Sequence, residues 1–337
     1  MRADTDHEGT PPGSRGLFVG LCVLDIIQAV ERLPAPDEKV TALRQSVSAG
    51  GPATNAAAAF AGLGGRAALL TGLGRHPLTD GIRADLGRIG SGVRLVDADA
   101  AWDGPPPVSS VMVNAHTGER SVVSTNAHGR DLRTPPQLPG EVAAADVVLV
   151  DGHHMAIARA AAEHARALGR RVVLDGGSWK PGTAELLRHV DVAVCSAVFR
   201  PPGATAPDDV LAFLLDHGVT CAAVSRGPLP IHWRTRGGGS GELPVPAVPH
   251  VADTTGAGDI LHGALAHALA PYREDRLTEA AFLTALRSAA DTASHATATF
   301  GTRAWMPGAP PAAAPADPAG RRAPEIPAGT RRRPGAT

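Results

Sequence analysis

The sequence predicts an α/β fold, in which helices cover both faces of a mostly parallel sheet. Between residues 146 and 227, apolar runs of strand length alternate with segments whose apolar residues recur at helical spacing. These runs contain few polar residues before their last positions, which is typical of strands buried on both faces. Regular strand–helix alternation makes the strands parallel, because each helix serves as a crossover. Sites in such sheets gather in the loops that follow the strands.

The first half of the chain supplies two strands, a helix and a hairpin. Residues 1–15 are polar and are predicted to be a disordered leader. "GLFVGLCVLDII" at 16–27 predicts one buried strand that ends at Asp25. "GGPATNAAAAFAGLGG" at 50–65 predicts an alanine-rich helix, because Gly-Gly-Pro opens it and glycines close it. The strand "AALLTGLG" follows, and then a predicted hairpin, "PVSSVMVNAHTGERSVVST", which turns at "AHTGE".

The second half alternates strands and helices as far as residue 227. A glycine-rich turn with edge-strand character at 234–251 leads into "DTTGAGDILHG", and one or two closing helices lie within 277–301. The segment 307–337 is rich in Pro, Ala and Arg without periodicity and is predicted to be disordered. The predicted strands are 146–152, 170–177, 191–196 and 221–227, and the predicted helices between them are 156–169, 182–190 and 208–218.

Composition excludes several classes of partner. Lys and Arg number 32 and Asp and Glu number 33, so no overall field favours nucleic acid or a membrane surface. No apolar run approaches membrane-spanning length. Cys22, Cys195 and Cys221 are far apart and lack metal-ligand spacing, which is typical of a reduced, cytoplasmic protein.

The stretch Asp253–Gly263 contains the clearest chemistry. Apolar residues after Asp259 recur at helical spacing, so Gly256, Ala257 and Gly258 lie where a helix leaves backbone N–H groups without partners. Such an end attracts anions, yet Asp259 in its first turn would repel them. The conflict disappears if a phosphoryl group is transferred there, because transfer needs both N–H groups that steady the charge and a base for the attacking hydroxyl.

Two segments together carry a family resemblance. "GGPATNAAAAFAGLGG" and "DTTGAGDILHGALA" resemble the paired signatures of the ribokinase-like (PfkB-type) carbohydrate kinases, and the resemblance runs from about Leu17 to Pro307. It implies a three-layer α/β/α kinase domain over 16–306 with a small β lid, here from about 26–47 and 103–124. It also implies transfer of the ATP γ-phosphate to a sugar hydroxyl with Mg²⁺, and often a homodimer. Lid closure would exclude water from the reaction.

The resemblance also assigns roles to residues. It makes Asp259 the catalytic base and Gly256, Ala257 and Gly258 the anion hole. Asp253 would shape the loop or lie near the metal. Asp25, Gly51 and Asn55 match sugar-binding positions, although Asp25 could be an exposed strand-end carboxylate and Asn55 a packing residue. Thr254 and Thr255 would face the phosphates or make ordinary turn hydrogen bonds. Arg120 could meet a charged substrate group or be a solvated strand residue.

Two motifs depart from the family pattern. The usual Asn-x-x-Glu after a central strand corresponds to Ser196–Phe199, which has neither residue. The usual Thr-x-Gly-x-x-Gly becomes "SRGPLP", in which Ser225 and Gly227 are retained as candidate ATP-binding residues. Either change could weaken binding of ATP or Mg²⁺, so a sugar- or nucleotide-sensing protein without catalysis is an alternative.

The substrate is predicted more coarsely than the reaction. "VVLDGG…DVAVCS" and the motif helix resemble the branch that contains sulfofructose kinase, and the surroundings of Asp25 resemble ketohexokinase. A ketose-like substrate phosphorylated on a hydroxymethyl group is therefore favoured. A nucleoside kinase is the second enzyme alternative, with Trp102 the one aromatic residue obvious near the lid. His153, His154 and His262 are interpreted as packing or surface residues because their spacing does not suit a metal.

Overall fold

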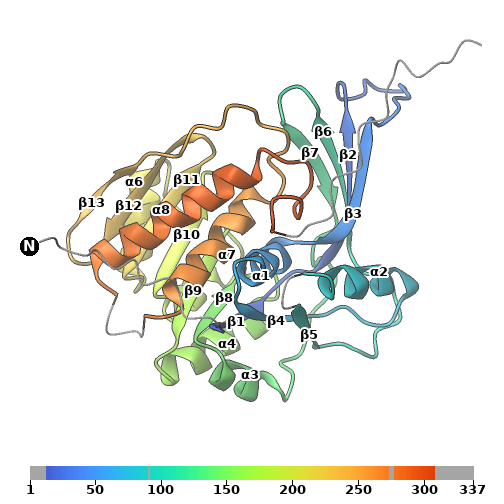
Figure 1. Ribbon diagram of the computed structural model, residues 1–337. Helices are drawn as coiled ribbons and strands as arrows, with labels where there is room; N and C mark the ends of the chain where they lie inside the picture. Colours follow the sequence, from blue (N-terminus) through green and yellow to red (C-terminus); the bar gives the residue numbers. More distant parts are fainter. Residues whose placement is uncertain (1–12, 90–91, 273–276, 308–337) are drawn as a thin grey trace, which may run out of the picture.

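The computed structural model describes residues 13–89, 92–272 and 277–307 (Figure 1). The predicted leader and tail therefore fall almost entirely outside the described residues. Within these ranges no helix has both the length and the apolar character needed to cross a membrane.

A nine-stranded sheet runs through the molecule in the order β13-β12-β11-β10-β9-β8-β1-β4-β5. The strands from β11 to β5 are parallel, and β12 and β13 continue one edge antiparallel. The mostly parallel sheet expected from the alternation is thus confirmed. Its strands are β1 (Arg15–Val19), β4 (Arg66–Thr71), β5 (Val93–Asp97), β8 (Val147–Val150), β9 (Arg171–Gly176), β10 (Val192–Ser196), β11 (Cys221–Arg226), β12 (Leu229–Thr235) and β13 (Ser240–Leu243).

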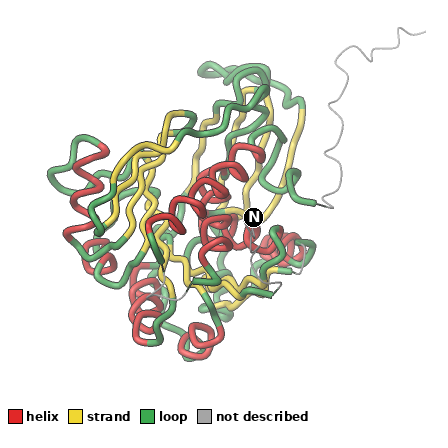
Figure 2. The backbone as a smooth tube through the Cα atoms, turned by 60° about the vertical axis from the view of Figure 1, so that its left-hand side comes forward, coloured by secondary structure: helices red, strands yellow, loops and turns green. Residues whose placement is uncertain are grey.

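Helices cover both faces of this sheet (Figure 2). One hydrophobic core lies beneath α1 (Pro52–Gly62), α2 (Pro77–Leu86), α7 (Ala257–Leu269) and α8 (Glu279–Ala296). A second core lies beneath α3 (Leu138–Ala144), α4 (Met155–Ala167), α5 (Thr183–Leu187) and α6 (Pro207–Asp216). The result is the expected three-layer α/β/α sandwich, with α8 as the closing helix.

A second sheet of four strands stands to one side of the sandwich, in the order β3-β2-β6-β7 (Figure 1). It comes from the two segments in which the lid was predicted. Phe300, from the segment after α8, packs beneath it with Ile27 and Val111. The strands are β2 (Val23–Val30), β3 (Arg44–Gly50), β6 (Val108–Asn114) and β7 (Arg120–Ser124).

The single strand predicted at 16–27 is wrong. The chain forms β1, leaves the large sheet at Gly20 and enters the second sheet as β2. The buried carboxylate of Asp151 explains the break, because it accepts hydrogen bonds from the backbone N–H groups of Leu21 (2.8 Å) and Ala53 (3.2 Å). Asp25 therefore lies inside β2, in the second sheet, and not at the end of a core strand.

Helices α1 and α7 cross in close contact, which sets the position of the motif. A Cβ atom built on Gly263 of α7 would lie 2.2 Å from the carbonyl oxygen of Ala56 in α1. Only glycine permits this approach. The crossing holds the start of α7 against the start of α1.

We expect Gly263→Ala to lower the free energy of unfolding by ~1–3 kcal/mol, because the added methyl group must force the two helices apart. Chemical denaturation measures the change. Gly81→Ala in α2 is the matched control, since a Cβ there meets nothing within 4 Å, and it should raise stability by ~0.5–1 kcal/mol through helix propensity. Equal stability of Gly263→Ala and the wild type would contradict the close crossing.

Candidate active site

The start of α7 opens into free space. Gly256 precedes the helix in the left-handed conformation, with φ 72°, and its Cβ would lie 2.9 Å from the Thr302 methyl group, so the position requires glycine. Gly258 is exposed, and a Cβ there would meet nothing within 4 Å. The N–H groups of the first turn have no partners within the helix. An anion can therefore approach Gly258 closely, whereas the Ala257 N–H of the predicted anion hole donates to the Thr254 carbonyl oxygen (3.3 Å).

Asp259 lies in this first turn and remains partly exposed. The Asn55 side chain, from α1, donates a hydrogen bond of 2.8 Å to its Oδ2 atom. Burial raises the pKa of Asp259, and the Asn55 hydrogen bond and the charges of His262 and Arg120 oppose that rise. The structure thus brings together two predicted site residues that are 204 positions apart in the sequence.

Asp25 lies on the same side of the molecule, in β2 of the second sheet. Its carboxylate sits so close to Gly50 that a Cβ there would lie 1.8 Å from Oδ2. Burial raises the pKa of Asp25 to about 6, a hydrogen bond with Ser109 opposes the rise, and the negative charge of Asp259 adds to it. The two carboxylates therefore act on each other electrostatically.

Gly51 and Asp253 have structural explanations of their own. Gly51 caps α1 with φ 96°, and a Cβ there would lie 2.5 Å from the Leu21 carbonyl oxygen. The Asp253 carboxylate accepts from the backbone N–H groups of Thr255 (2.8 Å) and Gly301 (3.0 Å). Asp253 thereby shapes the loop that precedes α7, one of the two roles expected for it.

The two threonines of the motif differ in their contacts. The Thr254 hydroxyl donates to the Gly118 carbonyl oxygen (3.0 Å) and accepts from Arg120 Nη1 (2.8 Å). Arg120 is thus bonded to the motif loop and links the β6–β7 hairpin to it. The Thr255 hydroxyl is buried and has no hydrogen-bond partner among the described residues.

The segments that depart from the family pattern lie at the ends of β10 and β11. Ser196 donates to the Gly177 carbonyl oxygen (2.7 Å), and Phe199 is buried against Trp179. Ser225 donates weakly to the Cys195 carbonyl oxygen (3.4 Å). Gly227 forms the exposed β11–β12 turn with φ 61°. Neither segment offers a carboxylate to a metal, and no group of three His, Cys, Asp or Glu that could hold one occurs among the described residues.

The three histidines differ in their burial. His262 is buried, and its ring nitrogens lie 2.6 Å and 2.8 Å from the carbonyl oxygens of Gly258 and Val194. His154 is buried as well, and burial lowers its pKa to about 4. His153 lies beside Asp151 and Lys180, and burial lowers its pKa.

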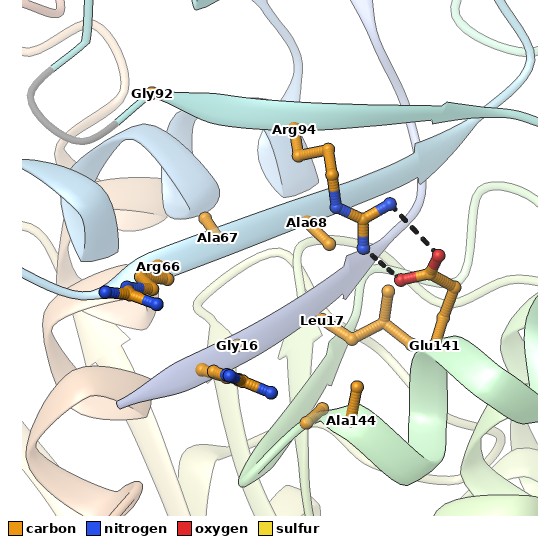
Figure 3. Close-up of a pocket in the computed structure, with 11 residues that line it drawn as sticks. Gly16, Leu17, Arg66, Ala67, Ala68, Gly92, Arg94, Glu141 and Ala144 are labelled. Carbon is orange, nitrogen blue, oxygen red and sulfur yellow. Dashed lines mark hydrogen bonds and ion pairs between the residues drawn. The ribbon is translucent and has the colours of Figure 1, made fainter. Parts of the chain in front are cut away.

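The described residues line hollows in at least two separate places. A cavity of about 520 Å³ lies at the amino-terminal ends of β1, β4 and β5, where Arg94 pairs with Glu141 of α3 (Figure 3). The start of α7 lies at the other end of the strands, so this cavity is not the candidate site. The second hollow, about 640 Å³, is lined by Leu33, Asn114, Glu119, Arg120, Val122 and Thr254. It lies between the second sheet and the motif loop.

Sequence reasoning missed Arg303. Its guanidinium donates to the Asn55 Oδ1 atom (2.9 Å) and to the Ala49 carbonyl oxygen (2.6 Å). Its Nε atom lies 3.8 Å from the Asp85 carboxylate. Burial lowers the pKa of Arg303. The one signal available was an arginine inside "GTRAWMPG", a short stretch after the closing helix that contains no known motif.

An α/β/α sandwich with a small second sheet beside a glycine-opened helix start is the architecture of a ribokinase-like phosphotransferase. The chain belongs to the pfkB family of carbohydrate kinases, whose family model matches residues 16–308. It is therefore a sugar kinase, as the resemblance implied.

Individual relatives agree with this assignment. A provisionally assigned ribokinase from Agrobacterium tumefaciens is 28% identical, with a TM-score of 0.75 over 88% of this chain and 94% of that one. Arabidopsis thaliana ribokinase, solved with ribose and ATP, is 25% identical, with a TM-score of 0.69 over 87% and 95%. Mus musculus ketohexokinase is 34% identical over 107 residues, which span 32% of this chain and 35% of that protein.

We expect the free energy of unfolding to depend on pH through the ionisation of Asp25. Its pKa is about 6 in the fold against 3.8 ordinarily, so the native state binds the extra proton. The free energy of unfolding should therefore fall as pH rises through about 4 to 6, by up to ~3 kcal/mol from this group. Asp25→Asn should lose this part of the pH dependence, and Asp216→Asn, an exposed control, should keep it. Parallel curves for the wild type and Asp25→Asn would show that Asp25 titrates normally.

Proposed function

We propose that this kinase transfers the γ-phosphate of ATP to a hydroxymethyl group of a sugar or sugar derivative, with Asp259 as general base. One observation carries the proposal: a partly exposed carboxylate stands in the first turn of a helix, next to an exposed glycine, Gly258, beside which there is open space. A resting anion would be repelled there. A passing phosphoryl group needs both features.

In the proposed reaction, the backbone N–H groups of Gly256, Ala257 and Gly258 hold the γ-phosphate. The acceptor hydroxyl gives its proton to the Asp259 carboxylate as its oxygen bonds to the γ-phosphorus. The bond between that phosphorus and the bridging oxygen breaks, and ADP leaves with the electron pair. Asn55 binds Oδ2 of Asp259, which leaves Oδ1 for the hydroxyl.

The remaining predicted residues receive supporting roles. The unpartnered Thr255 hydroxyl faces the phosphates, while Ser225 and Gly227 line the nucleotide side. Thr254 joins the lid hairpin to the motif through Arg120 and Gly118 and does not bind phosphate in this proposal. We propose Mg²⁺ as the ion that ATP brings with it. Bound magnesium neutralises phosphate charge, and it commonly keeps several waters.

A ketose is the favoured acceptor. The partial similarity to mouse ketohexokinase supports it, as does Asp25, which can accept hydrogen bonds from sugar hydroxyls when ionised. Gly51 and Asn55, at the start of α1, would also line the sugar site. The second sheet would act as the lid. A nucleoside is disfavoured because one face of the Trp102 ring is already occupied by the Arg130 guanidinium, 4.9 Å from the ring centroid.

We also propose a cytoplasmic homodimer. Val47 and Val123 are 52% and 72% exposed on the outward face of the second sheet, where the partner would pack. The three cysteines are free and buried, which suits a reducing compartment.

The substrate class is tested by ATP consumption against ketoses, aldoses, nucleosides and sugar phosphates. Turnover greatest with a ketose supports the proposal. Turnover confined to nucleosides would replace it with the nucleoside kinase. Binding without turnover on every member of the panel would favour the sensing protein.

We expect Asp259→Asn to lower kcat by ~10²–10⁴-fold and leave sugar and ATP binding largely unchanged, because the base is lost while the shape is kept. Steady-state kinetics and calorimetric titration measure the two effects. Asp216→Asn, a control at the exposed end of α6, should behave as the wild type. Near-normal turnover by Asp259→Asn would overturn the mechanism.

A further inference from the structure

Arg303 connects three separate parts of the molecule next to Asp259. It follows α8, yet its guanidinium donates to the end of β3 at Ala49 and to α1 at Asn55. The same Nη1 atom also donates to the Thr302 hydroxyl at 2.9 Å. These contacts hold Nη1 and Nη2 at defined positions, because losing them would leave a charged donor unsatisfied, whereas Nε has no hydrogen-bond partner among the described residues.

The contact with Asn55 decides which way the Asn55 amide points. A side-chain amide has an accepting oxygen on one side and a donating nitrogen on the other. Arg303 can only donate, so the oxygen of Asn55 must face it. The nitrogen must then face Asp259, where it donates to Oδ2 at 2.8 Å. The reversed amide would place two donors together on one side and two acceptors on the other.

Asn55 is an unusual choice for its place in the helix. It is 3% exposed, inside α1, and is followed by a run of four alanines. Asparagine is a weak helix former, so propensity does not explain it. The two hydrogen bonds that join it to Arg303 and Asp259 do.

We propose that Arg303 is a positioning residue for phosphoryl transfer: it locks the Asn55 amide so that Asn55 holds Oδ2 of Asp259 and directs Oδ1 to the acceptor hydroxyl. This inference rests on the proposed function of Asp259. Arg303 acts through Asn55 and has no assigned contact with substrate.

A lysine could not replace Arg303 fully. The guanidinium reaches Asn55 and Thr302 with Nη1 and Ala49 with Nη2, while Nε lies toward Asp85. A lysine ammonium is a single compact donor without this planar fork. A lysine would keep the positive charge and lose the hydrogen-bonding geometry. The variant therefore separates the contribution of charge to kcat from the contribution of geometry.

A double-mutant cycle tests the inference. We expect Arg303→Met to lower kcat by ~10–100-fold, because a small displacement of the base costs that much, with ~3-fold or less change in the KM for ATP. Arg303→Lys should recover only part of the loss. If Arg303 acts through Asn55, Arg303→Met in an Asn55→Ala background should lower kcat by less than ~3-fold further. Independent, multiplying losses would overturn the inference, as would an unchanged kcat in Arg303→Met.

A second measurement needs no substrate. Carbon-13 NMR of the Asp259 carboxyl should give a higher pKa in Arg303→Met than in the wild type, because the Asn55 hydrogen bond that favours the ionised form is no longer held and the nearby positive charge is lost. Arg303→Lys keeps the charge, so a rise in the Asp259 pKa that remains in this variant reports the hydrogen bond. Asp25, Asp151, His262 and Arg120 also act on these groups and are unchanged in the variant. Arg188→Met, at an exposed position, is the matched control. An identical Asp259 pKa in Arg303→Met would contradict the inference.

The two measurements separate the possible failures. A wild-type protein without turnover on any sugar would contradict the proposed function, and the Asp259 pKa would still test the Arg303 contact. An active wild type with an equally active Arg303→Met variant would contradict only the role of Arg303. Should Arg303→Met fail to fold, Arg303→Lys and Asn55→Ala carry the comparison.

Discussion

The close crossing of α1 and α7 is the constraint on which the rest of the site depends. Gly263 removes the side chain that would keep the helices apart, since a Cβ there would lie 2.2 Å from the Ala56 carbonyl oxygen. The starts of both helices then lie together, although the chain between them builds most of the large sheet. Because of this crossing, the amide of Asn55 reaches Asp259. Asp259, the proposed base, and Asn55, which binds it, come from the two glycine-opened helices of the sequence.

Charge balance is the second feature of the site. The negative charges of Asp25 and Asp259 make each carboxyl group harder to ionise. Arg303 carries the opposite charge nearby. A buried guanidinium costs free energy unless it is paired and hydrogen-bonded. Here its donors also fix an amide and a strand end, so one costly residue serves both electrostatics and geometry. Asp25, Asp259 and Arg303 thereby belong to a single electrostatic network.

Much of the fold could be predicted from hydrophobic pattern alone. Alternation between residues 146 and 227 predicts the parallel sheet because each element has its own period and length. The break between β1 and β2 could not be predicted. It depends on Asp151, which is 130 positions from the Leu21 amide that it binds. The local sequence there is an uninterrupted apolar run, which does not indicate a break.

Some residues of the candidate site could likewise be predicted from the sequence, and others could not. Gly256 and Asp259 are neighbours in the sequence, so the motif displays them together. Arg303 is 248 positions from Asn55, and no spacing connects the two. The bonds of Arg120 to Thr254 likewise require the hairpin to fold over the motif loop, 134 positions away in the sequence. Contacts of this kind become visible only when the chain is folded.

The most direct measurement is a crystal structure with a ketose and a non-hydrolysable ATP analogue bound together. The account predicts that Oδ1 of Asp259 lies within ~3.2 Å of the acceptor hydroxyl oxygen, a hydrogen-bond distance. It also predicts that the terminal phosphate lies against the backbone N–H groups at the start of α7. An acceptor hydroxyl facing another carboxylate, or a terminal phosphate bound away from α7, would contradict the account.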